Sequence, residues 1–108
     1  MFMKLVPFDS IHVSRVPRDP GIYIIYLKQT GEPVYVGRSR RDIYSRLQRH
    51  VTRCGSRKVA EALSKHVPLE FEYECMMSVE QAESQLITAF GTTRFFNLRR
   101  ETDPADWD

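Results

Sequence analysis

The sequence has few cysteines and no long apolar run. Two cysteines, Cys54 and Cys75, are too few for a disulfide framework and lack CxxC spacing, so we expect free, buried thiols and a cytoplasmic, reducing compartment. No apolar stretch approaches the roughly 20 residues of a membrane span. The amino terminus, MFMKLVPFDS, lacks the apolar core of a signal peptide. We therefore expect neither a disulfide scaffold nor a membrane partner.

A large net charge is also missing. Sixteen Lys and Arg against 14 Asp and Glu leave a formal charge of +2, and 42% of the 108 residues are hydrophobic. This balance excludes a highly charged disordered tail and a collagen-like repeat. Length and apolar content suit one packed core, so we expect a single domain over residues 1–108.

The charges that are present are segregated along the chain. Residues 38–58 hold eight basic residues and one acid, a net charge of +7, so the rest of the chain carries −5. The acids gather at Glu70, Glu72 and Glu74 and in the tail 101–108. One cationic face is typical of proteins that bind polyanions, and nucleic acid is the expected partner. An alternative is a protein-interaction domain that uses the acidic strand face and tail.

Hydrophobic patterning predicts an α+β domain with three antiparallel strands flanked by helices. The expected strands are 21–27 and 33–37, which form a hairpin, and 69–77, in which apolar residues alternate with acids. The expected helices run from an Asp42 N-cap to about Cys54–Gly55, over 56–66, and from Ser78 to about Phe90. Residues 1–20 are expected to be a loose lead-in with room for a short strand or turn, and residues 94–98 a short strand or extended segment.

Six side chains on this scaffold are of types that assist phosphodiester hydrolysis: Tyr23, Tyr35, Arg46, His50, Glu83 and Asn97. Paired strands place the two tyrosines on one face, and i,i+4 spacing places Arg46 and His50 on one face of a helix. An arginine binds two phosphate oxygens at once, and one carboxylate can hold a Mg²⁺ whose other ligands are water and substrate. A tyrosine or histidine can act as base when nearby cations lower its proton affinity.

The order of these residues resembles the GIY-YIG endonuclease family over about residues 20–98. Gly21-Ile22-Tyr23 matches the first signature triad, and Tyr35-Val36-Gly37 matches the second with Val for Ile. Arg46 lies eleven residues after Tyr35, one more than in many relatives. The extra residue lies within 39–41, or else Ser45 takes the aligned position. We prefer the first, because Arg46 keeps Leu47 and His50 in register.

The resemblance implies a role for each residue. Tyr35 is the lead candidate for activating water, with Tyr23 and His50 positioning or relaying the proton, and Arg46 clamping the scissile phosphate. Glu83 is the single protein carboxylate on one Mg²⁺ or Mn²⁺, and Asn97 braces the site. Further substrate-binding residues are expected at Gly37, Arg38, Arg40, Arg41, Arg49 and Arg53.

The implied function is a metal-dependent DNA endonuclease that leaves a 5′-phosphate and a 3′-hydroxyl, in a setting such as DNA repair or recombination. RNA stays open as a substrate. Only about twenty residues precede the hairpin and ten follow Asn97, so we expect cleavage directed by structure or single-strandedness rather than by a sequence-reading module. The alternative is a nucleic-acid-binding module of the same fold without catalysis.

Overall fold

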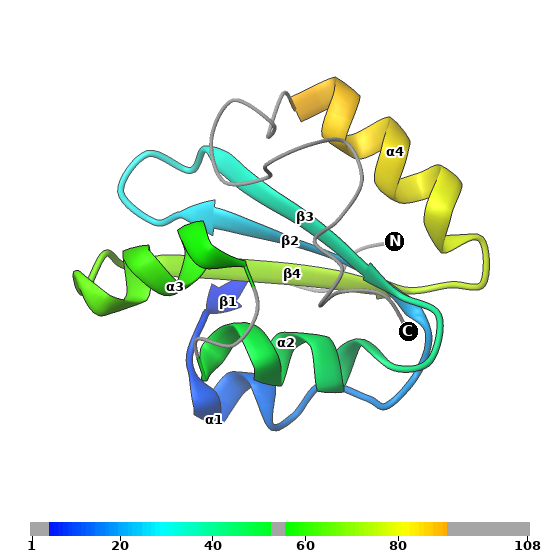
Figure 1. The fold of residues 1–108 in the computed structure, drawn as a ribbon, viewed down its shortest axis with the longest axis horizontal. Coiled ribbons are helices and arrows are strands. Elements are labelled where there is room, and N and C mark those ends of the chain that lie inside the picture. The colour runs from blue at the N-terminus through cyan, green and yellow to red at the C-terminus, as the bar shows by residue number, and fades with distance from the viewer. Residues whose placement is uncertain (1–4, 53–55, 91–108) are drawn as a thin grey trace.

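The computed structural model describes residues 5–52 and 56–90, which form a sheet between helices (Figure 1). The sheet is antiparallel, in the order β1-β4-β2-β3. Its strands are β1 (Val6–Pro7), β2 (Gly21–Leu27), β3 (Pro33–Ser39) and β4 (Leu69–Cys75). The expectation of three strands is wrong, because β1 adds a fourth strand at the β4 edge. A two-residue strand has no readable alternation, and its proline is tolerated at a sheet edge.

Four helices are described: α1 (Ser10–Val13), α2 (Ile43–Val51), α3 (Arg57–Ser64) and α4 (Val79–Phe90). The expected N-cap is confirmed, since the Asp42 carboxylate accepts the backbone N–H of Ser45 at 2.6 Å. Helix α2 ends at Val51, before the expected Cys54–Gly55, because the C-cap residue Thr52 leaves helical geometry with φ −91° and ψ 7°.

The sheet is covered on both faces, which explains the nearly continuous apolar run in β2. Helices α1, α2 and α3 pack on one face, where Tyr23, Ile25 and Phe71 join a core with apolar residues of these helices. Helix α4 covers part of the other face, where Leu86 packs against Ile24 and Val36 (Figure 1).

The topology brings the starts of two helices to one end of the sheet. Strands β3 and β4 both run antiparallel to β2, so their last residues lie at the same end of the sheet. The chain continues from that end into α2 after β3 and into α4 after β4 (Figure 1). The loop from β3 into α2 is held by the buried Ser39, whose hydroxyl accepts the N–H groups of Arg41 at 3.1 Å and Asp42 at 2.9 Å. Helices α2 and α4 therefore begin at the same end of the sheet and cover opposite faces of it (Figure 1).

No helix within residues 5–52 and 56–90 is long and apolar enough to cross a membrane. Cys75 carries a free thiol, but the thiol is exposed rather than buried, because Cys75 is the last residue of β4. The expected features that lie outside the described residues are Arg53, Cys54, Asn97, the segment 94–98 and the tail 101–108.

Candidate active site

Three rings of the expected site lie together on the α2 face of the sheet. The β2–β3 register pairs Tyr23 with Gly37 and Ile25 with Tyr35, so both phenols point to one face, as the hairpin predicts. Their ring centroids are 6.3 Å apart and nearly parallel. The His50 ring from α2 lies 4.9 Å from Tyr35 and 5.5 Å from Tyr23. The register of β2 and β3 thus brings the two tyrosines together, and α2 places His50 against both rings.

His50 is fully buried and bonded through both ring nitrogens. Its Nε2 lies 2.7 Å from the Tyr23 hydroxyl oxygen, and its Nδ1 accepts the backbone N–H of Ser56 at 3.3 Å. Burial first, and then the charges of Arg46 and Arg49, lower the pKa of His50 to about 3. The imidazole is therefore neutral near neutral pH. Ser56 was not among the expected site residues, because its contribution is a backbone group.

The two signature glycines are explained by close approach of neighbouring atoms. A Cβ on Gly37 would collide with the ring and hydroxyl of Tyr23, which lies across it from the paired strand. A Cβ on Gly21 would collide with the backbone carbonyl of Glu74 on β4. The absence of a side chain at Gly37 therefore leaves the space that the Tyr23 ring occupies. Gly37 directly precedes Arg38 in β3.

Arg46 occupies the helix position next to the three rings. Its side chain is buried, one turn before His50, and its charge acts on that histidine. Ser45 is exposed instead, and its N–H and hydroxyl both bond to the Asp42 carboxylate at the helix start. This placement favours Arg46 over Ser45 and an extra residue in the preceding loop.

Glu83 lies with Arg38 on the other face of the sheet. Arg38 pairs with Ile22 in the strand register, so its side chain points to the α4 face. Its Nε donates to Glu83 Oε1 at 3.0 Å, and the two side chains are only 14% and 5% exposed. The candidate site therefore has two parts, the ring cluster with Arg46 and the Arg38–Glu83 pair. They flank β3 from opposite faces.

The donor set near Glu83 fits a weakly held hard cation. Within the part of the chain that the structure describes, no three His, Cys, Asp or Glu side chains gather into a metal-binding group. Glu72, on the same face, is bonded by the Tyr26 hydroxyl. One buried carboxylate suits magnesium, which commonly keeps several waters and takes one or two protein carboxylates together with substrate phosphate oxygens. Glu83 is thus the described residue that could hold such an ion.

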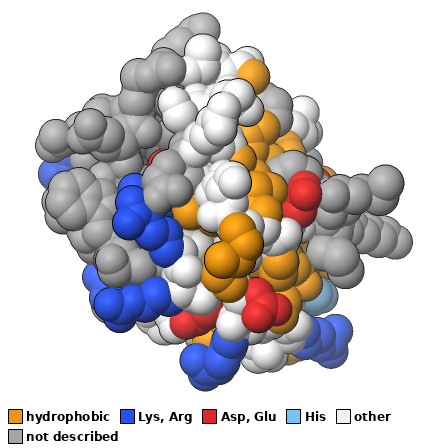
Figure 2. All heavy atoms as spheres, turned by 90° about the vertical axis from the view of Figure 1, so that its right-hand side faces the viewer, with side chains coloured by type: hydrophobic (Ala, Val, Ile, Leu, Met, Phe, Trp, Pro, Cys, Tyr) orange, Lys and Arg blue, Asp and Glu red, His pale blue; other side chains and the backbone are white. Residues whose placement is uncertain are grey.

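Exposed basic side chains surround this end of the sheet. Arg40 and Arg41 lie in the loop after β3, and Arg49 on α2 is also exposed. Figure 2, which looks onto the right-hand end of Figure 1, shows Lys and Arg side chains mainly along its left and lower margins, with Asp and Glu side chains between them and a band of apolar side chains beside them. This arrangement agrees with a cationic surface next to the candidate site.

Arg18 extends this surface from a segment that charge counting along the sequence did not include. Its guanidinium lies 4.2 Å above the ring of Tyr44 on α2. The loop that carries it is tied to the same helix, because the Ile43 N–H bonds the Asp19 carbonyl at 2.9 Å. Only the folded structure indicates that Arg18 belongs to this surface, because it lies 20 residues before the basic stretch 38–58 in the sequence.

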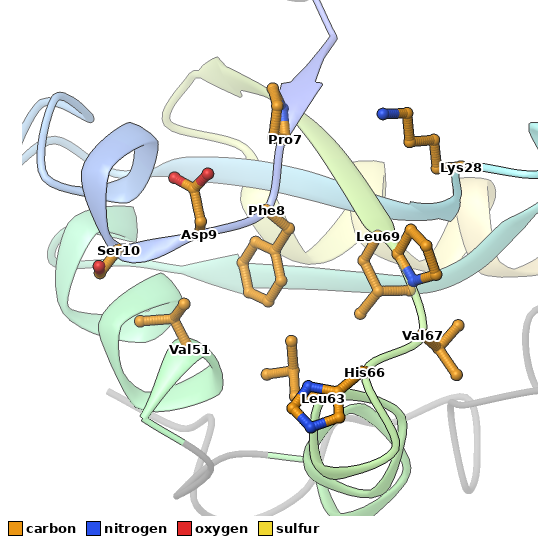
Figure 3. Close-up of a pocket in the computed structure, with 11 residues that line it drawn as sticks. Pro7, Phe8, Asp9, Ser10, Lys28, Val51, Leu63, His66, Val67 and Leu69 are labelled. Carbon is orange, nitrogen blue, oxygen red and sulfur yellow. The ribbon is translucent and has the colours of Figure 1, made fainter.

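An open pocket of about 480 Å³ lies elsewhere, between the β1–α1 junction and the end of α3 (Figure 3). Phe8, Leu63 and Leu69 give it apolar walls, and Lys28 and His66 lie at its margin. None of the described site residues lines it. The pocket is therefore separate from the candidate active site.

Comparison with known proteins agrees with the residue pattern. The profile of the family described as GIY-YIG catalytic domain matches residues 19–97. No curated protein and no solved structure matches the chain significantly. The match covers most of the chain and spans both glycine–tyrosine triads, the α2 pair and Glu83, so the chain belongs to the GIY-YIG nuclease family.

Proposed function

We propose that the protein is a divalent-metal-dependent endonuclease that hydrolyses phosphodiester bonds in DNA. The observation that carries the proposal is the contact among Tyr23, Tyr35 and His50, with Arg46 one helical turn from His50. Two phenols, a neutral imidazole and a guanidinium are groups that can handle a proton and phosphate charge together.

Each side chain has a proposed task. Tyr35, as phenolate, takes a proton from the attacking water, whose oxygen bonds to phosphorus as the bond to the 3′ oxygen breaks. Tyr23, bonded to His50, orients the reacting groups. Arg46 holds two phosphate oxygens, since a guanidinium presents paired N–H groups and keeps its charge. The products are a 5′-phosphate and, after proton uptake by the leaving oxygen, a 3′-hydroxyl.

Glu83 is the proposed ligand of one Mg²⁺ or Mn²⁺. When bound, such an ion offsets negative charge on the phosphoryl and leaving oxygens. Arg38 donates a hydrogen bond to the same carboxylate at 3.0 Å, so a positive charge already lies beside the proposed metal ligand. Asn97 keeps its proposed bracing role, on the family resemblance alone.

Substrate choice is proposed to depend on nucleic-acid shape or single-strandedness. Arg40, Arg41 and Arg49 are exposed around the site and would contact backbone phosphates, which position a nucleic acid without reporting its sequence. Gly37 and Arg38 at the end of β3 would approach the same backbone, and Arg53 is proposed to join them.

The test is a cleavage assay with single-stranded, duplex, flap and junction DNA and matched RNA, each with Mg²⁺, Mn²⁺ or a chelator. We expect metal-dependent cutting of at least one DNA form with 5′-phosphate ends. Glu83→Gln and Arg46→Ala should both abolish cutting, and Glu83→Gln should still bind DNA. Absence of cutting from every form with either metal would contradict the proposal.

One observation supports a second candidate, a binding module without catalysis. The Arg38–Glu83 ion pair gives the buried carboxylate a positively charged partner without a metal. Under this alternative, the protein binds DNA independently of Mg²⁺ and does not cut it, and Glu83→Gln leaves the binding unchanged. Binding and cleavage measured on the same protein preparation separate the two candidates.

A further inference from the structure

The geometry around His50 determines which of its ring nitrogens carries a proton. Nδ1 accepts the backbone N–H of Ser56 at 3.3 Å, and Nε2 lies 2.7 Å from the Tyr23 hydroxyl oxygen. A ring nitrogen accepts an N–H only through its lone pair, so Nδ1 carries no proton. The neutral ring that burial enforces then has its single proton on Nε2. The Nε2–H group therefore donates to Tyr23.

The amide that makes this contact is available because of where Ser56 stands in the fold. Ser56 is the N-cap of α3, and its hydroxyl accepts the Val59 N–H. The N–H of an N-cap residue has no carbonyl partner within its own helix. Here it is buried and directed back to α2, where His50 offers the acceptor. One residue thus starts α3 with its side chain and contacts His50 with its backbone.

We propose that the Ser56 backbone amide is a positioning group that keeps His50 in the Nε2–H tautomer. His50 then orients Tyr23 by donating a hydrogen bond, and it does not receive the tyrosine's proton. In the opposite tautomer, the Nδ1–H would face the Ser56 N–H, and two donors would meet in a buried place. The catalytic meaning rests on the proposed nuclease function, whereas the tautomer is a property of the folded chain.

The consequence concerns the path of the proton. A relay through His50 requires Nε2 to accept the proton of Tyr23, which in turn requires the Nδ1–H tautomer. With that tautomer disfavoured, the hydroxyl proton of Tyr23 is directed to an acceptor other than His50. Tyr23 and His50 then form an orienting pair, and the water-activating step stays with a phenol.

Ser56 offers a matched pair of substitutions. Its φ of −58° is close to the value that proline imposes, so Ser56→Pro removes the N–H at an unchanged φ, and the proline Cδ takes the place of the amide hydrogen facing His50 Nδ1. Ser56→Ala also loses the capping hydroxyl but keeps the N–H, so the two variants differ in the amide N–H and in the proline ring that replaces it. Long-range ¹H–¹⁵N correlation spectra of the labelled full chain report the tautomer. A His12→Gln, His66→Asn background leaves His50 as the sole histidine.

We expect the Nε2–H pattern in the parent chain and in Ser56→Ala, and a clear Nδ1–H population in Ser56→Pro. If the nuclease is active, kcat should fall at least about tenfold from Ser56→Ala to Ser56→Pro at similar KM. An Nδ1–H pattern in the parent chain overturns the proposal, as does an identical tautomer in both variants. If Ser56→Pro fails to fold, the parent spectrum decides alone. The spectra need no cleavage, so an inactive protein contradicts the nuclease proposal without affecting this one.

Discussion

Arg38 Nε and Glu83 Oε1 lie 3.0 Å apart and join edge strand β3 to the second turn of α4. Both side chains are largely withdrawn from solvent, so their charges interact more strongly than an exposed pair. The proposed cation would approach the same carboxylate. Arg38 and a metal ion are therefore expected to compete electrostatically for Glu83.

The first prediction is that Arg38→Gln strengthens Mn²⁺ binding. Removing one positive charge beside the carboxylate should tighten binding about tenfold, equivalent to about 1.4 kcal/mol. Electron paramagnetic resonance of free Mn²⁺ measures this without nucleic acid. Glu83→Gln should weaken binding by at least about tenfold on the same scale. Arg41→Gln removes an exposed charge and serves as the control, and equal affinity in Arg38→Gln and Arg41→Gln would contradict the competition.

The second prediction concerns Gly37, where a Cβ would enter the space of the Tyr23 ring. Gly37→Ala should lower the free energy of unfolding by about 1–3 kcal/mol, the usual cost of overpacking. The same substitution in a Tyr23→Ala background should cost much less, because the colliding ring is gone. Denaturant titration of the four proteins gives the coupling energy. If the two losses of unfolding free energy simply add, the Tyr23 ring is not the cause of the Gly37→Ala destabilisation. Phe8→Leu, combined with Gly37→Ala in the same way, serves as the reference pair for which the losses should add.

Local rules were sufficient to predict several parts of the site. Period-two alternation in a hairpin places Tyr23 and Tyr35 on one face, and i,i+4 spacing does the same for Arg46 and His50. Both relationships depend on residues close along the chain or on adjacent strands. The Asp42 N-cap is also a local feature, and it is observed as expected.

Other parts required the tertiary arrangement. Arg38 and Glu83 are 45 residues apart, and only the packing of α4 on β3 brings them together. Arg18 joins the basic surface because its loop folds onto α2, and Ser56 acts through an amide that every residue except proline possesses. Strand β1 has only two residues, so its sequence shows no alternation of apolar and polar side chains. Its pairing with β4 could therefore not be predicted from the sequence.

The third prediction is that stability falls with acid below about pH 6.5 because of His50. Its pKa is lowered from 6.5 to about 3 in the folded protein, so between these values the unfolded chain binds one more proton. The free energy of unfolding should therefore fall by about 1.4 kcal/mol per pH unit from this group as pH decreases. Urea titrations at several pH values measure the slope.

His50→Gln should remove that contribution to the slope, while Ile43→Val, which loses only a buried methyl group, should keep it. The second variant controls for general destabilisation of about 0.5–1.5 kcal/mol. Equal slopes in His50→Gln and the parent chain would mean that His50 titrates near its ordinary pKa in the folded state.

The last prediction is that Arg18 makes a phosphate contact outside the reaction centre. The exposed Arg18 side chain is held against α2 by this cation–π contact, with its guanidinium 4.2 Å from the centre of the Tyr44 ring. Arg18→Ala should lower the slope of log affinity against log salt by about 1 for DNA, and Lys65→Ala, at the exposed C-cap of α3, should not. Arg18→Lys keeps the charge but not the planar fork, so it should keep most of the slope and bind more weakly. Fluorescence anisotropy across a salt series makes the measurement, and parent-like binding by Arg18→Ala at every salt concentration would remove Arg18 from the nucleic-acid surface.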